Sequence, residues 1–265
     1  MILCYEKGKL KEKKSCREAL HLESEVSPVI SITGAGGKTT TALRLAWEYK
    51  EAGNPAIVTT STHLEIWKQP WFLLEESMEK LEKIRKTEGQ VWVGIPLEKS
   101  LISEENVSFQ KMKAVSEAFL RKICAMHVPV IIEADGAKRM PCKVPAEHEP
   151  VIVPQTTFVC TVYGIDAVGQ RICDGCFRAE LTAQMLQKRI TDVLEAEDLA
   201  KIMVNKQGGR KGIPSNVEQC FILNKAEDDR NLEVAEKVCR ELEKYGDVPV
   251  LVCSSDIEER AENYR

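Results

Sequence analysis

The residues whose types and spacing most clearly allow chemistry lie between 31 and 41, where three glycines are followed by Lys38 and three threonines. Apolar, β-branched residues at 29–32 predict a strand before the glycines, and the apolar spacing from Ala42 onward predicts a helix after them. In this order the backbone N–H groups of the loop and the positive end of the helix dipole converge on one point, which suits an anion. Lys38 would contact the β- and γ-phosphates of a nucleotide, and the Thr39 hydroxyl would bind Mg²⁺. The sequence therefore predicts a nucleoside triphosphate site made by Gly34, Ala35, Gly36, Gly37, Lys38, Thr39 and Thr40.

The loop departs from the usual phosphate-binding pattern G-x-x-x-x-G-K-[ST] at one position, because Ile32 stands where that pattern has a glycine. The remaining run, Gly-Ala-Gly-Gly-Lys-Thr, is tighter and resembles the ATP loop of the Mur ligases. ATP is therefore one candidate nucleotide.

A second candidate element is an apolar strand at 128–133 that ends in acids, with Glu133 at its last position and Asp135 shortly after. Such a strand is typical of the element that holds Mg²⁺ opposite a phosphate loop. We predict that Asp135 supports the metal. We predict that Glu133 is the catalytic base, which orients or deprotonates an attacking water.

A third strand, at 219–223, runs into Asn224, Lys225 and Glu227. This run resembles the N-K-x-D motif with which GTPases bind guanine, although Glu227 stands where aspartate is usual. By that resemblance Asn224 and the acid would bond the base edge, and the Lys225 stem would lie along the ring. GTP is the second candidate nucleotide, and the sequence leaves the choice between ATP and GTP open.

A strand predicted at 55–60 is followed closely by His63. In a parallel sheet this strand would end on the same edge as the glycine loop, so His63 is a candidate acid, base or switch contact there.

The segment after Asp135 is dense in charge and proline, and a loop of this length near a metal site is typical of a substrate loop. Lys138, Arg139 and Lys143 would neutralise phosphate groups in this loop, and His148 is a further candidate catalytic residue.

Composition excludes several classes of function. The 265 residues carry a net charge of −4, which argues against general nucleic-acid binding. No apolar run reaches the roughly 18 residues of a membrane span. The N-terminus becomes charged at Glu6 and Lys7, too early for a signal peptide, so we expect a cytoplasmic protein.

Ten cysteines are present, and without a secretion signal we expect reduced thiols, many of them buried. Cys173 and Cys176 form a C-x-x-C pair. A single pair of this kind is weak evidence for metal binding or redox chemistry, and the sequence leaves both open.

Apolar strands alternate with amphipathic helices, which predicts an α/β fold with a mostly parallel sheet flanked by helices. We expect an N-terminal segment at 1–28 followed by a single domain at 29–265. The predicted strands are 29–33, 55–60, 91–94, 128–133, 157–162, 219–223 and 249–253. The predicted helices are 38–52, 75–87, 109–126, 179–188, 195–205, 229–245 and 255–262.

Several segments together resemble the YqeC-type proteins: Thr-Gly-Ala-Gly-Gly-Lys-Thr-Thr at 33–40, Thr-Thr-Ser-Thr-His at 59–63, the charged segment 133–154, Gly-Ile-Asp-Ala-Val-Gly at 164–169 and Leu-Asn-Lys-Ala-Glu at 223–227. That family is described as accessory to selenium-dependent molybdenum hydroxylases. The resemblance implies a P-loop NTPase-like fold and a role in maturing a selenium or molybdenum cofactor. A molybdenum hydroxylase or a selenium-delivery protein would be the partner. The C-x-x-C run departs from the family, which commonly has His-Arg-Pro-like residues there.

The predicted function is thus binding and hydrolysis of ATP or GTP with Mg²⁺ during maturation of such a hydroxylase. An ATP-dependent small-molecule kinase or ligase is an alternative that the Mur-like loop favours, although the chain is short for a complete Mur ligase. A non-catalytic nucleotide switch that recruits a partner is the other alternative.

Overall fold

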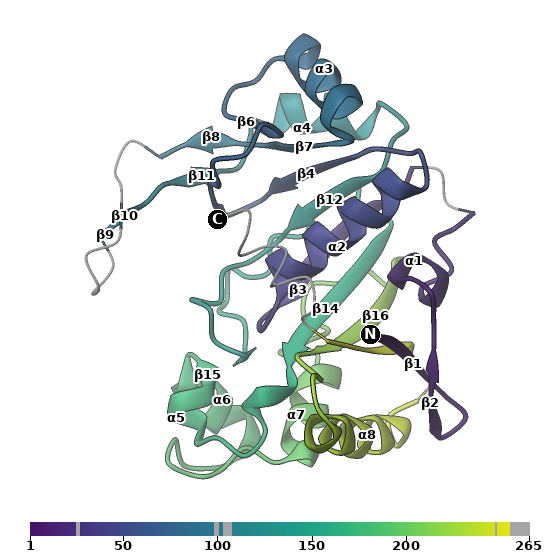
Figure 1. Ribbon diagram of the computed structural model, residues 1–265. Coiled ribbons are helices and arrows are strands. Elements are labelled where there is room, and N and C mark those ends of the chain that lie inside the picture. The colour runs from purple at the N-terminus through teal and green to yellow at the C-terminus, as the bar shows by residue number, and fades with distance from the viewer. Residues whose placement is uncertain (25–26, 98–100, 103–107, 247, 255–265) are drawn as a thin grey trace.

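A ten-stranded sheet runs through the molecule in the computed structural model (Figure 1), which describes the chain apart from residues 25–26, 98–100, 103–107, 247 and 255–265. The strand order is β2-β1-β17-β16-β14-β3-β12-β4-β7-β6. The strands are β1 Ile2–Glu6, β2 Lys9–Glu12, β3 Val29–Gly34, β4 Ala56–Thr60, β6 Phe72–Leu73, β7 Gln90–Val93, β12 Val130–Glu133, β14 Phe158–Gly164, β16 Glu218–Asn224 and β17 Val250–Cys253. From β17 to β6 neighbouring strands are parallel, whereas β1 pairs with β17 and β2 in antiparallel fashion.

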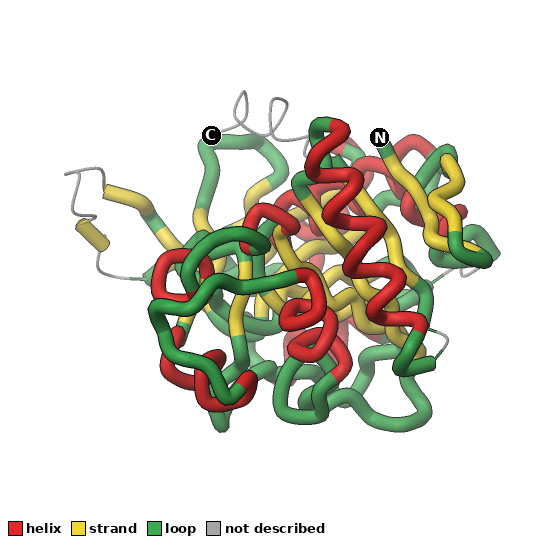
Figure 2. The backbone as a smooth tube through the Cα atoms, turned by 90° about the horizontal axis from the view of Figure 1, so that it is seen from below, coloured by secondary structure: helices red, strands yellow, loops and turns green. Residues whose placement is uncertain are grey.

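Helices cover both faces of this sheet (Figure 1, Figure 2). They are α1 Cys16–Ala19, α2 Lys38–Glu51, α3 Met78–Glu88, α4 Glu117–Cys124, α5 Ile172–Gly175, α6 Ala179–Leu186, α7 Ala196–Val204 and α8 Asp229–Glu243, with a 3-10 turn at Ile165–Ala167. The predicted mostly parallel α/β fold is confirmed. Among the residues that the structure describes, no helix is long and apolar enough to cross a membrane.

Short strands form three small accessory sheets. They are β5 His63–Glu65, β8 Ile95–Pro96 and β11 Lys111–Lys113 in one, β9 Leu101–Ile102 with β10 Ser108–Phe109 in another, and β13 Cys142–Lys143 with β15 Cys176–Phe177 in the third.

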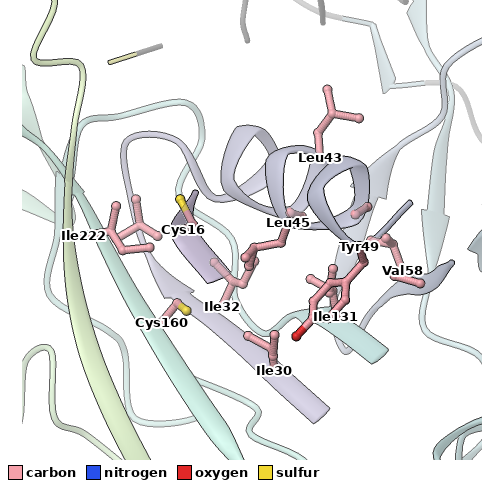
Figure 3. Packing of buried hydrophobic residues seen from close by; sticks show 14 of the residues in the cluster. Cys16, Ile30, Ile32, Leu43, Leu45, Tyr49, Val58, Ile131, Cys160 and Ile222 are labelled. Carbon is pink, nitrogen blue, oxygen red and sulfur yellow. The ribbon is translucent and has the colours of Figure 1, made fainter. Parts of the chain in front are cut away.

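The alternation of side chains along each strand divides the core between the two faces. Ile30 and Ile32 of β3 pack with Leu45 and Tyr49 of α2 on one face (Figure 3). Val29 points to the opposite face, where α3 and α4 supply apolar side chains. At the other end of that opposite face, α7 and α8 cover β16 and β17. The parallel strands are therefore buried on both sides, as their continuous apolar runs predicted.

All seven predicted strands appear within two residues of their expected bounds. Most predicted helices appear within three residues, and the helix predicted at 255–262 lies outside the described residues. The helix predicted at 109–126 was wrong in its first half, because Lys111–Lys113 form strand β11 with Met112 buried. The helix begins only after Ser116, whose side chain accepts a hydrogen bond from the Phe119 N–H.

The first 28 residues contribute two strands to the large sheet, since β1 pairs with β17. The glycine-loop strand β3 lies between β12 and β14. The chain leaves β3 toward β4 on one side, and it leaves β14 toward β16 on the other. In open α/β sheets, ligands bind beyond the carboxyl ends of strands at such a divergence.

Candidate functional site

The glycine loop lies at the carboxyl end of β3, where the chain must turn in a space that has no room for side chains. Gly34, Gly36 and Gly37 all have positive φ angles, of 92°, 72° and 133°. A Cβ atom on Gly36 would lie 2.3 Å from the nitrogen of Gly164 and 2.6 Å from the oxygen of Pro141. The backbone therefore requires glycine here.

Residues 136–141, which we call the strap, run over this loop. The Gly36 N–H donates to the Met140 carbonyl at 3.0 Å, and the Ala35 N–H donates to the Val162 carbonyl at 2.8 Å. The Gly34 N–H donates to Asp135 Oδ2 at 3.1 Å. The backbone N–H groups in the first half of the loop therefore already have acceptors within the protein.

The second half of the loop opens the 14-residue helix α2 and presents free donors. No acceptor in the described part of the chain bonds the backbone N–H groups of Gly37, Lys38 and Thr39. Gly37 is the N-cap residue and supplies no capping side chain. Gly37 and Thr39 are partly exposed. The unsatisfied donors and the helix dipole make this end of α2 suited to an anion.

Lys38 lies at this helix end and is bound by the loop. Its ammonium group donates to the Gly34 carbonyl at 2.8 Å and lies 3.3 Å from Asp135 Oδ1. That oxygen is buried and accepts no hydrogen bond from the described residues. Asp135 also lines a cavity of about 10 Å³ beside Thr33 and Thr161, which is room for about one water molecule.

Glu133 contacts the residue predicted to bind the metal. The Thr39 hydroxyl donates to Glu133 Oε2 at 2.8 Å. Burial raises the pKa of Glu133, and the nearby charge of Lys38 and the Thr39 hydrogen bond offset only part of that rise. A raised pKa makes a carboxylate a stronger proton acceptor than usual, which suits a general base.

A buried network of charges extends from Asp135 away from the loop. Lys143 is fully buried, and its ammonium group contacts Asp135 Oδ2 at 2.9 Å, Glu149 Oε2 at 2.8 Å and the Gly136 carbonyl at 2.7 Å. Arg178 contacts the same oxygen of Glu149 at 2.6 Å. Lys143 was expected to neutralise phosphate. That expectation was wrong, because the lysine is buried against two carboxylates.

The Asn-Lys run at the end of β16 lies against the loop. The Asn224 side chain donates to the Gly36 carbonyl at 3.1 Å, and its nitrogen lies 2.0 Å from where a Cβ on Gly37 would be. Lys225 pairs with Asp166 at 2.8 Å. Asp166 belongs to the 164–169 run, whose position directly after a strand was a signal for a polar role. Glu227 is exposed.

The remaining predicted residues lie on the surface around this edge. His63 begins β5 and is exposed, and His148 is exposed in the turn before Glu149. Lys138 and Arg139 are both exposed, with left-handed φ angles of 47° and 61°. The structure thus brings together the loop, Glu133, Asp135 and Asn224, and places the two histidines at its periphery.

The C-x-x-C pair is divided between two environments. Cys173 is partly exposed and bonds Asp174, whereas Cys176 is buried and lies opposite Cys142 in the β13–β15 pair. Among the residues that the structure describes, no group of three or more His, Cys, Asp or Glu side chains is placed to hold a metal ion.

Comparison with known proteins agrees with the resemblance drawn from the motifs. The chain matches the model of a family described as YqeC protein over residues 30–180. It is also 25% identical over 221 residues to a protein of Escherichia coli (strain K12) named "Uncharacterized protein YqeC", an alignment that covers 82% of this chain and 83% of that protein. Because the family model matches more than half of the chain, the protein belongs to the YqeC family.

Proposed function

We propose that this protein binds a nucleoside triphosphate at the N-terminus of α2 and hydrolyses it. The observation that carries the proposal is the set of N–H groups at Gly37, Lys38 and Thr39 that bond no acceptor in the described part of the chain, with a lysine ammonium group at the same place. The β- and γ-phosphates would accept from these donors. Lys38 would turn from the Gly34 carbonyl toward them, because a phosphate is a stronger acceptor than a carbonyl.

The residues present fit a magnesium ion. Mg²⁺ prefers oxygen ligands and is commonly held by one or two carboxylates, a hydroxyl and the phosphates themselves. Thr39 and Glu133 bring a hydroxyl and a carboxylate within 2.8 Å of each other, and Asp135 Oδ1 is a buried carboxylate oxygen that forms an ion pair with Lys38 at 3.3 Å. The ion would neutralise charge that develops on the transferred phosphoryl group.

Two divisions of labour between the acids are compatible with these contacts. In the first, which the sequence predicts, Asp135 supports the metal and Glu133 accepts a proton from water. In the second, Glu133 supports the metal through its contact with Thr39, and Asp135 fixes Lys38. The raised pKa of Glu133 supports the first division, whereas the Thr39 hydrogen bond supports the second.

The test combines nucleotide titration, with and without Mg²⁺, and measurement of phosphate release. In the first division, Asp135→Asn weakens Mg²⁺-dependent binding, while Glu133→Gln binds normally and turns over slowly. In the second division, Glu133→Gln weakens Mg²⁺-dependent binding, whereas Asp135→Asn leaves the Mg²⁺ dependence of binding unchanged. Wild-type rates of hydrolysis in both variants would remove both assignments. A phosphorylated or amide-joined product in place of free phosphate would favour the kinase or ligase alternative.

We further propose that the base is guanine, read by Asn224 and Glu227, and that Lys138 and Arg139 contact phosphate when the strap moves. The contact between Asn224 and Gly36 supports a base site next to the phosphate site, because it holds the Asn-Lys run against the loop. The left-handed backbone of Lys138 and Arg139 supports a special role for the strap, since such strain often marks functional segments.

The biological role that we propose is maturation of a selenium-dependent molybdenum hydroxylase in the cytoplasm, with nucleotide turnover driving the accessory step. The motif resemblance to the YqeC-type proteins supports this role. Co-purification of the tagged protein with a molybdenum hydroxylase, dependent on an intact Lys38, would test the partnership.

A further inference from the structure

Two cysteines from separate segments face each other beside the buried charge network. Cys142 of β13 and Cys176 of β15 are direct partners in a parallel strand pair. Neighbouring strands lie about 4.8 Å apart, and directly opposed side chains point to the same side. A disulfide needs a Cα separation of about 4.4–6.8 Å, so this pairing meets the main geometric requirement without movement of the backbone.

The two thiols interact, and their pKa values shift in opposite directions. The neighbouring Cys142 thiol lowers the pKa of Cys176, whereas the Cys176 sulfur and burial raise the pKa of Cys142. Both side chains are buried, with 3% exposure for Cys176 and 0% for Cys142. A lowered pKa is a property of an attacking thiol.

A second pair of cysteines in the same protein has the same strand register. Cys160 and Cys220 are also direct partners, in the β14–β16 pair at the centre of the large sheet. Both are 0% exposed, and burial raises the pKa of Cys220. That pair has the same spacing but is enclosed in the ten-stranded sheet, whereas Cys142 and Cys176 lie in a separate two-stranded sheet, so it serves as an internal control.

We propose that Cys142 and Cys176 are a reversible disulfide site that reacts with low-molecular-weight disulfides. The Cys176 thiolate attacks one sulfur of the small disulfide, which forms a mixed disulfide and releases one small thiolate. The Cys142 thiolate then attacks the sulfur of Cys176 and releases the second small thiolate. The two cysteines lose two electrons and two protons, and the small disulfide is reduced to two thiols.

This bond would join the two segments that hold the charge network. Cys142 directly precedes Lys143, and Cys176 lies two residues before Arg178; these two cations share Glu149. Residue 142 also follows the strap, whose Met140 carbonyl bonds the glycine loop. The disulfide would fix the strap in its present position over the loop. This disulfide goes beyond the proposed nucleotide binding, and the chemical test of the disulfide does not require that the protein binds a nucleotide.

The experiment uses the whole reduced protein and excess oxidised glutathione, followed by alkylation of free thiols under denaturing conditions and non-reducing peptide mass mapping. The expected result is the loss of two free thiols per chain and a Cys142–Cys176 linked peptide that dithiothreitol removes, while Cys160 and Cys220 remain alkylated. Cys173→Ser should still form the link. Cys142→Ser should stop at a mixed disulfide of Cys176 with one glutathione.

Two results would overturn the proposal in the wild-type protein, whatever the variants do. One is full alkylation of Cys142 and Cys176 after oxidation. The other is a link from Cys176 to Cys173 alone. Hydrogen exchange of the strap amides gives a second readout. The exchange rate should fall on oxidation and recover on reduction.

Discussion

Replacing Lys143 with methionine tests the buried charge network most sharply. The change keeps an unbranched apolar stem of similar length and removes the ammonium group, together with its contacts to Asp135 at 2.9 Å and Glu149 at 2.8 Å. Removing one partner of a buried ion pair costs about 3–5 kcal/mol, because a buried charge is left without compensation. Here each carboxylate keeps a second cation, since Asp135 retains Lys38 and Glu149 retains Arg178. We therefore expect the lower end of that range, about 3 kcal/mol.

The assay is urea unfolding followed by circular dichroism. With a slope of roughly 3 kcal/mol per molar urea, Lys143→Met should lower the midpoint by about 1 M. The matched control is Lys211→Met, because among the described residues the Lys211 ammonium group bonds only the carbonyl oxygens of Ala146 and Glu147. Losing hydrogen bonds from an ammonium group costs about 1.5 kcal/mol at the low end of the usual range, which suits this partly exposed lysine. Equal midpoints for the two variants would show that the network contributes no more than a surface contact, and the reasoning would fail.

Three other predictions address pH, the loop and the base. Burial raises the pKa of Glu149, but the hydrogen bonds from Arg178 and Lys143 outweigh burial and lower this pKa to about 2. Its contribution to stability is therefore complete above about pH 4.5 and is lost as the pH falls toward about 2, so Glu149→Gln should flatten the acid limb of stability measured by unfolding at each pH. Gly36→Ala should destabilise by about 2 kcal/mol more than Gly53→Ala, measured by thermal unfolding, because both have φ near 70° but only Gly36 meets backbone atoms. In competition binding, Glu227→Asp should sharpen a GTP preference of about 1–2 kcal/mol and Glu227→Ala should abolish it; equal binding of both purines in all three proteins would contradict the guanine assignment.

The large sheet could be predicted because its strands are buried on both faces and read as continuous apolar runs. The convergence of the glycine loop, the acids after β12 and Asn224 also followed from sequence, since parallel strands end on one edge. The edge strand β2 and its neighbour β1 were missed because the charged residues of this segment resemble a solvated stretch. Charge is common on edge strands, where it discourages pairing with other chains.

The charge network could not be predicted, because its members are separated in the sequence and their burial is set by tertiary packing. Lys143 looks like a surface lysine when its neighbours alone are considered. Its partner Asp135 comes from the end of β12, and Arg178 reaches Glu149 from β15 and α6. The pairing of Cys142 with Cys176 depends on the same meeting of two segments, whereas the sequence pattern pointed to Cys173.

Calorimetric titration of the folded protein with Mg-ATP and Mg-GTP tests the central claim most directly. The wild-type protein should bind at least one of them in a Mg²⁺-dependent manner. Lys38→Met should weaken that binding by about 2–4 kcal/mol, which is roughly 30-fold to 1,000-fold. Lys50→Met, at the opposite end of the same helix, should bind as the wild type does. Absence of nucleotide binding by the wild-type protein, or unchanged affinity in a folded Lys38→Met variant, would contradict a phosphate site at the N-terminus of α2.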